Sequence, residues 1–415
     1  MRTSDPFETV EVDPRRTLAT TIVVIVGLAV AAVLFPTQAE VVAVILALFV
    51  MIMLHELGHF LAAKRSGMKV TEFFVGFGPR LWSVRRGETE YGVKAVPLGG
   101  YCRIIGMTNL EEVDPQDEPS AYRNKRTAAK VFVAGAGPAV HFVIAVVLMF
   151  AVLFFAGDYR SQHPTLVLAQ TSQGAAAAGL KAGDTVVSIN GTQVRDWTQV
   201  QNLINPAGHP AQPGEIVHFV VQRGDEAIPF DVTLQQSTDS STKRAVAGIL
   251  PNTVVPRLGI VSSISEAPRQ VADFGWESIK AMGTVFSPSG ISNYFRILSG
   301  DTGSNTNQNA RFSSPVGVGA LATDAVKAGW VSVFELLIAI NIFVGLFNLL
   351  PLLPFDGGHI AIAMYEWAAS TIRRRRVQVD AAKLLPITVA VVAVLGFIFL
   401  SSLFLDITHP IANPF

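Results

Sequence analysis

The sequence predicts a polytopic α-helical membrane protein with about five transmembrane helices and one inserted extracytoplasmic α+β domain. Half of the 415 residues are hydrophobic and only 15% are charged, whereas a soluble domain usually carries about 25% charged residues. Several apolar runs approach the roughly 20 residues that a helix needs to cross a bilayer. Between two of these runs, residues 166–235 alternate like short strands separated by turns.

The charge balance and the cysteine content exclude further classes. Lys+Arg and Asp+Glu each number 32, so the formal net charge is zero. A nucleic-acid-binding protein would show a basic excess, and we expect no nucleic-acid partner. Cys102 is the single cysteine, so any extracytoplasmic part folds without an intrachain disulfide.

Five apolar segments are candidate membrane helices. They are Leu18–Phe35, Val41–Ala63, Val131–Ala156, Val331–Leu353 and Leu384–Leu405. The first also resembles a signal peptide, because Arg15-Arg16 precede it and Thr37-Gln38-Ala39 follow it. Its apolar run of about 18 residues is longer than the usual 7–15, which favours a retained helix.

Basic clusters set the expected orientation, because short cytoplasmic loops are rich in Lys and Arg. Clusters precede the first segment, lie between the second and third, and lie between the fourth and fifth. They are Arg15-Arg16; Lys64-Arg65, Arg85-Arg86, Arg123, Lys125 and Arg126; and Arg373–Arg376. All three regions are then cytoplasmic, and the stretch Asp158–Gly329 is extracytoplasmic. Arg373–Arg376 is interpreted as a topology anchor, and a lipid or partner site is the alternative.

The second segment contains the motif H-E-x-x-H at residues 55–59. Four residues of α-helix place His55 and His59 on one face, where two neutral imidazoles can bind one Zn²⁺ with Glu56 beside them as a base. Ionisable groups inside a membrane helix are costly and indicate function; a polar packing cluster is the alternative. Val41 to Leu54 spans about 21 Å, which places the site nearer the cytoplasmic face.

The fourth segment supplies a third ligand candidate. Asp356 ends an apolar run that contains Pro351 and Pro354 and is followed by Gly357-Gly358, so the backbone there is expected to be irregular. Irregular backbone at membrane depth is tolerated where it lines a cavity, and catalytic zinc usually has three protein ligands. The alternative is an interfacial turn.

Together these motifs resemble the site-2 protease family of intramembrane zinc metalloproteases. His55–His59 reads HELGH, and residues 348–358 read N-x-x-P-x-x-P-x-D-G-G. Gly76–Pro79, Pro97–Tyr101 and Ser314–Gly317 also resemble family segments, in the family's order. The likeness is greatest to actinobacterial enzymes with one PDZ domain that cut membrane-bound anti-sigma factors.

The resemblance implies the cofactor and the roles of several residues. It implies Zn²⁺ bound by His55, His59 and Asp356, Glu56 as the catalytic base, and Asn348 contacting the substrate or the oxyanion. It implies a membrane-associated β-hairpin, which we place at Tyr91–Ile105, with Gly99 and Gly100 at the substrate. It also implies an upstream site-1 protease that trims the same single-pass transmembrane substrate.

Departures from the family pattern leave some roles open. Leu18–Phe35 would be an extra helix. Relatives commonly have G-P-x-x-N in the third segment, whereas this chain has His141 where the Asn stands. His141 is interpreted as a residue that supports a metal ligand or packs beside it, with approach to the metal as the alternative. His359 is interpreted as a residue that supports a metal ligand or lies at the membrane interface, and not as a ligand itself. Cys102 is expected to be a packing residue rather than a nucleophile.

The inserted region resembles a PDZ domain through G-L-x-x-G-D at 179–184 and V-x-x-I-N-G at 186–191. Strands are expected at Leu166–Ala169, Thr185–Asn190, Val217–Gln222 and Phe230–Leu234, and a helix at Asp196–Leu203. The domain either filters substrates or acts as a rigid spacer. Beyond it, Ser299–Ser313 reads as a flexible linker and Ala267–Met282 as an amphipathic membrane-surface helix.

The predicted organisation has five parts. Residues 1–40 hold the extra helix, 41–157 the first part of the catalytic core, 158–240 the PDZ domain, 241–330 the linker with the amphipathic helix, and 331–415 the second part of the core. The expected protein is a multi-pass cell-membrane zinc endopeptidase. Two alternatives are a metal or proton transporter, for which inverted repeats are lacking, and a non-catalytic PDZ scaffold, which would lack a ligand or the base.

Overall fold

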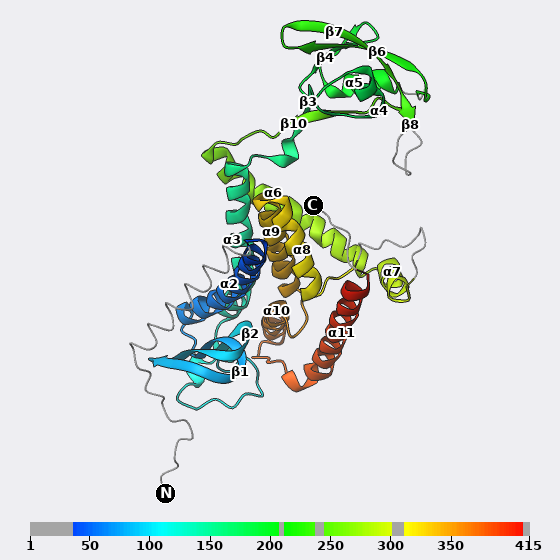
Figure 1. Ribbon diagram of the computed structural model, residues 1–415. Coiled ribbons are helices and arrows are strands. Elements are labelled where there is room, and N and C mark those ends of the chain that lie inside the picture. Colours follow the sequence, from blue (N-terminus) through cyan, green and yellow to red (C-terminus); the bar gives the residue numbers. More distant parts are fainter. Residues whose placement is uncertain (1–35, 207–210, 237–244, 301–310, 410–415) are drawn as a thin grey trace. The chain divides into compact units, whose positions relative to one another are not determined.

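The computed structural model describes residues 36–206, 211–236, 245–300 and 311–409. The predicted segment Leu18–Phe35 lies outside these residues, as does most of the predicted linker Ser299–Ser313. The chain forms two compact units: residues 1–151 with 264–415, and residues 152–263. Figure 1 shows the first as a helical unit with a small sheet and the second as a sheet with two short helices.

The first unit is built from helices and one sheet. The helices are α2 (Pro36–Arg65), α3 (Thr127–Phe155), α6 (Ile260–Val285), α7 (Pro288–Leu298), α8 (Pro315–Ala328), α9 (Trp330–Asn348), α10 (Asp356–Arg373) and α11 (Ala381–Thr408). Two short 3-10 helices, Glu118–Ser120 and Tyr122–Asn124, precede α3.

Four helices in the described part of the chain are long and apolar enough to span a membrane: Gln38–Arg65, Thr127–Phe155, Trp330–Asn348 and Ala381–Thr408. They fall on four of the five predicted segments. The predicted segment Val331–Leu353 is wrong at its end, because helix α9 stops at Asn348. Pro351 and Pro354 lack the amide hydrogen that a helix interior needs, and the chain turns before α10 begins.

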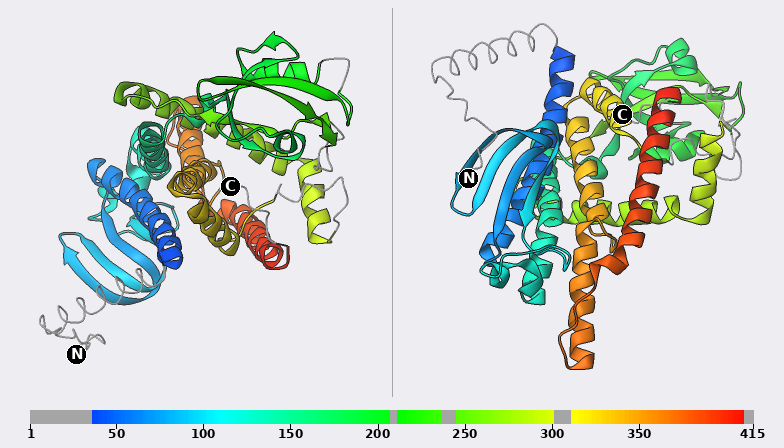
Figure 2. Two further views of the ribbon diagram at one scale, coloured as in Figure 1. Left: turned by 45° about the horizontal axis from the view of Figure 1, so that its top comes forward. Right: turned by 90° about the horizontal axis from the view of Figure 1, so that it is seen from below.

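The predicted hairpin at Tyr91–Ile105 is also corrected. The sheet is formed by the long strands β1 (Val70–Arg86) and β2 (Thr89–Ile104). Both arms of the expected hairpin pair with β1: Phe74 stands opposite Gly92 and also opposite Tyr101. The Phe- and Val-rich start of β1 therefore lies between the two arms (Figure 2).

Two apolar clusters hold this unit together around α2. One joins α2, the sheet and α3 through Ala63, Met68, Val70, Ile104 and Val133. The other joins α2 to α8 and α9 through Val44, Met51, Ala322, Ala325 and Leu337. The HELGH part of α2 lies between these clusters in sequence, so both α2 ends are fixed by packing.

The second unit is an antiparallel sheet with strand order β10-β3-β4-β6-β7, and β5 pairs with β4. Its strands are β3 (His163–Thr171), β4 (Thr185–Ile189), β5 (Thr192–Gln193), β6 (Ile216–Arg223), β7 (Glu226–Thr233) and β10 (Ile249–Val254); β8 (Gln235–Gln236) pairs with β9 (Ala245–Val246). The helices are α4 (Gln173–Ala178) and α5 (Trp197–Ile204). The four predicted strands and the helix at Asp196–Leu203 are confirmed.

Two features of the region after residue 240 differ from the prediction. Strand β10 pairs with β3, so the inserted domain continues past the predicted boundary at 240. The region 241–330 also holds three helices, α6, α7 and α8, where one was expected at Ala267–Met282. Helix α8 begins at Pro315, and the hydroxyl of the preceding Ser314 accepts hydrogen bonds from the amides of Val316 and Gly317 and so caps the helix.

Candidate metal centre

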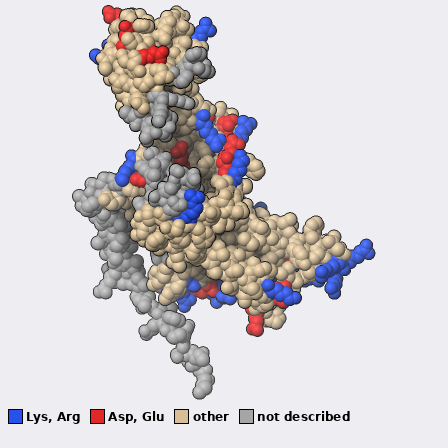
Figure 3. Space-filling view, turned by 90° about the vertical axis from the view of Figure 1, so that its right-hand side faces the viewer, with Lys and Arg blue, Asp and Glu red and all other residues tan. Residues whose placement is uncertain are grey.

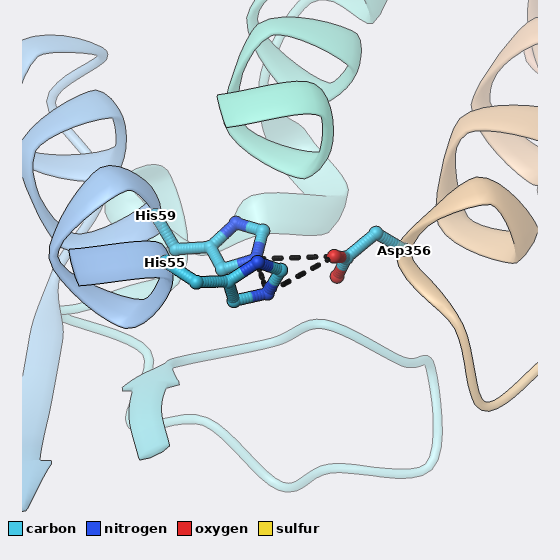
Figure 4. A group of neighbouring side chains, drawn as sticks. All are labelled: His55, His59 and Asp356. Carbon is cyan, nitrogen blue, oxygen red and sulfur yellow. Dashed lines mark hydrogen bonds and ion pairs between the residues drawn. The ribbon is translucent and has the colours of Figure 1, made fainter. Parts of the chain in front are cut away.

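Helix α2 presents two histidines at one point. His55 and His59 are buried, and their Nε2 atoms lie 3.1 Å apart. The four-residue spacing places both rings on one face of the helix, as Figure 4 shows. The local geometry of the helix brings the two rings together without help from distant segments. The sequence motif alone therefore accounts for the two histidine ligands.

Asp356 reaches the histidine pair from a different element. It is the first residue of α10, and its Oδ2 lies 3.3 Å from Nε2 of both His55 and His59 (Figure 4). The two glycines that follow let the chain fold tightly here: a Cβ on Gly357 would stand 2.2 Å from the carbonyl oxygen of Leu349, and one on Gly358 2.7 Å from Leu352. Because the atoms in the way belong to the backbone and cannot move aside easily, both positions require glycine.

Helix α3 closes the site with a residue that has no side chain. A Cβ on Gly137 would lie 2.3 Å from Nε2 of His59 and 2.7 Å from Nε2 of His55. Gly58 of α2 makes a similar approach, since its Cβ would lie 2.9 Å from the carbonyl oxygen of Ala136. These two glycines bring α2 and α3 into backbone contact directly at the histidine pair.

The three side chains fit a small divalent cation. A tetrahedral site with bonds of about 2.0–2.1 Å has ligand-to-ligand edges of about 3.3 Å, and the observed separations are 3.1, 3.3 and 3.3 Å. Nδ1 of His59 lies 2.8 Å from the carbonyl oxygen of Val133; donation of Nδ1–H to it leaves the Nε2 lone pair facing the centre. Oδ2 of Asp356 is buried without a hydrogen-bond partner among the described residues, as a metal ligand would be.

Glu56 lies partly buried beside this centre. The backbone of Cys102 in β2 lies near its carboxylate, so the sheet packs beside Glu56. Burial raises the pKa of the Cys102 thiol to about 12, which agrees with a packing residue and not a thiolate nucleophile.

Gly99 and Gly100 are buried where β2 passes α2, and a Cβ on Gly100 would lie 2.5 Å from Sδ of Met53. Close packing therefore accounts for Gly100 without a ligand.

Asn348 and His359 flank Asp356 in the sequence. Asn348 is the last residue of α9, and its side chain makes no hydrogen bond within the described ranges. His359 is partly buried in α10, three residues after Asp356, with its ring 6.2 Å from that of Tyr122. Neither belongs to the group of three side chains that the structure brings together.

His141 stands directly behind the histidine pair. It is 3% exposed, and its ring centroid lies 5.1 Å from that of His55. Its Nδ1 is 2.8 Å from Oδ1 of Asn341, and the amide of Asn341 donates to the carbonyl oxygen of Leu337. Asn341 was missed in the sequence, although a polar residue inside an apolar helix was a usable signal.

The chain matches the model of peptidase family M50 over residues 43–395. A helical membrane protein with an H-E-x-x-H histidine pair and a distant aspartate is the class that this fold and centre define. The chain belongs to peptidase family M50, the site-2 protease family, and the expectation of a zinc metalloprotease is confirmed.

Similar proteins cover almost the whole chain. Zinc metalloprotease Rip1 of Mycobacterium tuberculosis is 36% identical over 89% of this chain and 96% of its own length. Zinc metalloprotease Rip1 of Mycolicibacterium smegmatis is 34% identical over 88% and 97%. A solved PDZ domain of the SdrC-like protein of Listeria monocytogenes is 21% identical over 21% of this chain and 87% of that chain, with a TM-score of 0.18.

Proposed function

We propose that the protein is a zinc-dependent intramembrane endopeptidase that cuts single-pass transmembrane proteins. One observation carries this proposal: three ligand atoms lie 3.1–3.3 Å apart at the meeting point of helices α2 and α3, which are long enough to span a membrane. His55, His59 and Asp356 would hold Zn²⁺. His55 lies ten residues before the end of α2, or about 15 Å along the helix, which supports a site below the membrane surface.

The chemistry requires few groups. Zinc, when bound, supplies a Lewis acid that brings the pKa of a coordinated water near 7. The Glu56 carboxylate would accept a proton from the attacking water and deliver it to the nitrogen of the leaving amine. The Asn348 side-chain amide would donate a hydrogen bond to the oxyanion that develops on the scissile carbonyl. A substrate helix hides its peptide groups in hydrogen bonds, so it must unwind before cleavage.

The basic clusters support an orientation with the site nearer the cytoplasm and the inserted domain outside. Lys64 and Arg65 end α2 and Arg373 ends α10, so both helices that carry the ligands have their basic ends on one side under the positive-inside rule. Residues 158–254 would then be extracytoplasmic. The protein would reside in the cell membrane, with the lipid bilayer as its solvent.

The inserted domain offers a groove for an extended chain, which supports the assignment of a PDZ domain. A groove of about 920 Å³ runs between α5 and β10 and is lined by Trp197, Val200, Ile204, Gly248 and Ile249 among others. β10 is the last strand of the sheet order, so its outer edge can accept an added strand. The domain would admit substrates, such as anti-sigma factors, only after a site-1 protease has removed their extracytoplasmic bulk.

His141 is assigned a positioning role behind the metal ligands. Its Nδ1–H donates to Asn341 (2.8 Å), which fixes the ring beside His55. The variant Asn341→Leu removes the acceptor, and we expect turnover about tenfold lower with zinc content unchanged. Unchanged turnover would exclude this role.

The central test separates the base from the metal ligands. Glu56→Gln keeps the side-chain shape but cannot accept a proton, so cleavage of a purified membrane substrate should be abolished while one zinc per chain remains. His59→Ala should lose both zinc and cleavage. Wild-type turnover in the Glu56→Gln variant would rule out Glu56 as the base and favour a different chemistry.

A second experiment tests the filter. Since β10 pairs with β3, the deletion must remove the whole domain, residues 163–254. The shortened protein should cut an untrimmed substrate that the full chain leaves intact, and both proteins should cut the trimmed substrate. If the shortened protein still requires trimming, selection depends on the substrate helix or on the β1-β2 sheet instead.

A further inference from the structure

A basic cleft lies at the end of the helical unit where α3 begins and α10 ends. Its volume is about 460 Å³. Its lining includes seven basic side chains and one acid: Arg123, Lys125, Arg126, Lys130, Arg374, Arg375 and Arg376, with Glu366. These residues come from two segments more than 230 positions apart, so the cleft is a product of the fold and not only a linear basic run.

Specific contacts hold the two segments together. Arg376 donates to the carbonyl oxygen of Arg123 (3.1 Å) and to Oδ1 of Asn124 (2.7 Å). Lys130 of α3 forms a 2.8 Å ion pair with Glu366 of α10. The C-cap Arg374 takes the left-handed conformation with φ of 51°, which turns the chain back toward α3. A non-glycine residue in this conformation is strained and marks a position that its surroundings fix.

The basic charge in the cleft is only partly neutralised by the protein. Arg123 is paired with Glu118 and Lys130 with Glu366. Within the part of the chain that the structure describes, no carboxylate lies in ion-pair distance of Lys125, Arg126, Arg374 or Arg375. Figure 3 shows basic side chains gathered at a projecting end of the molecule.

The start of helix α3 adds to this positive field. The first turn of α3 contains no acidic residue, although the N-terminus of a helix carries a partial positive charge that acids normally offset. Here Lys125 and Arg126 stand directly before it. Repulsion among these groups is relieved by an anion, and the amides of a helix N-terminus are suited to a phosphate.

The surface of α10 beside the cleft indicates where the anion comes from. Tyr365, Trp367 and Ile372 are 56%, 59% and 81% exposed, and Trp367 also lines the cleft. Exposed Trp and Tyr next to basic residues are typical of the membrane–water interface. A free phosphate would not require apolar and aromatic side chains around its site, whereas a lipid would.

We propose that this cleft binds the phosphate headgroup of an anionic phospholipid. The headgroup would lie between Lys125, Arg126 and Arg375, with its acyl chains along the exposed apolar side of α10. Helices α3 and α10 also carry Gly137, which packs against the histidine rings, and Asp356, so the headgroup would hold together the ends of two helices that meet at the metal centre. The proposal rests on residence in a membrane and not on the identity of the peptidase substrate.

The test measures lipid retention by native mass spectrometry of the purified full-length chain in detergent. Dioleoylphosphatidylglycerol is compared with dioleoylphosphatidylcholine at equal mole fraction, and inorganic phosphate is the free-anion arm. We expect one retained phosphatidylglycerol, preferred over phosphatidylcholine by at least tenfold. The double variant Arg374→Gln/Arg375→Gln should bind it about 30-fold more weakly, since each basic side chain near an anionic lipid contributes about a factor of five.

The matched control is Arg85→Gln/Arg86→Gln, an equal charge change at the exposed end of strand β1 outside the cleft. It should leave retention unchanged. Equal loss in both double variants, equal retention of the two lipids, or displacement by millimolar inorganic phosphate would each overturn the proposal. The measurement uses purified protein, so it does not depend on any effect of these arginines on the direction of membrane insertion. Lipid retention is also measured without any cleavage reaction, so its outcome is independent of the proposed peptidase activity.

Discussion

Gly137→Ala tests whether α3 shapes the metal centre through the absence of a side chain. The added Cβ would lie 2.3 Å from Nε2 of His59, 2.6 Å from Cε1 of His55 and 2.7 Å from its Nε2. Ordinary contacts begin near 3.4 Å, so the His59 ring would have to retreat by about 1 Å. The atoms that must move are the proposed ligand atoms themselves.

The size of the effect of Gly137→Ala on activity depends on which atoms can move away from the added Cβ. Both histidine rings are the ends of side chains and can rotate away, so the helix pair is not expected to unfold. Alanine also favours a helix over glycine by about 1 kcal/mol. The loss therefore falls on the centre: a displacement of about 1 Å costs on the order of 100-fold in activity, and we expect zinc affinity to fall as well.

Gly135→Ala is the matched control. It lies two positions earlier in α3, and its nearest contact is Cδ1 of Ile360 at 4.0 Å, so activity should change by less than about twofold. The assay compares zinc per chain and cleavage rate of a purified membrane substrate for the two variants at equal fold content by circular dichroism. If both variants keep full zinc and the same rate, the histidines do not occupy the position described.

Three further substitutions test the packing of α8 against α11 and an ion pair of the inserted domain. Gly317→Ala would place a Cβ 2.3 Å from Oδ2 of Asp406, whereas a Cβ on Gly319 would meet open space. Gly317→Ala should therefore lower the free energy of unfolding by about 2 kcal/mol, and Gly319→Ala should raise it by up to about 1 kcal/mol. Equal shifts of the two variants in thermal unfolding would contradict this. The Arg223 guanidinium holds the pKa of Asp184 below its usual range, so the stabilisation is complete above the unfolded-state pKa of about 3.9 and is lost as pH falls through the lower folded-state value. Asp184→Asn should therefore cost about 2 kcal/mol at pH 7 and flatten the loss of stability below about pH 4, as hydrogen exchange of β4 and β6 in the full chain would show; an unchanged pH dependence would exclude this ion pair as the cause.

Sequence reasoning succeeded where the determining geometry is local. His55 and His59 share a helix face because four residues of α-helix make slightly more than one turn. Apolar runs located the four described membrane-length helices, because hydropathy depends on composition and not on contacts. The strands of the inserted domain followed from alternation, as in β6, where Val217, Phe219 and Val221 are buried.

Prediction from the sequence failed where contacts between distant segments determine the structure. Gly137 lay in a noted motif, but its role depends on how α3 packs on α2, which no local pattern contains. Strand β10 was missed because six residues with one proline carry a weak signal, and its pairing with β3 bridges about 85 positions. Gly76–Pro79 of β1 was noted as a family segment, but the start of β1 at Val70–Val75, which separates the two arms of β2, was not predicted.

The function proposed for the protein depends on the binding of one zinc ion by His55, His59 and Asp356. Zinc K-edge X-ray absorption of the purified full-length protein measures this directly. We expect one zinc per chain with nitrogen and oxygen ligands only, at about 2.0–2.1 Å, and loss of the bound zinc in Asp356→Ala. A sulfur ligand near 2.3 Å, or a first shell that is the same in wild type and Asp356→Ala, would contradict it.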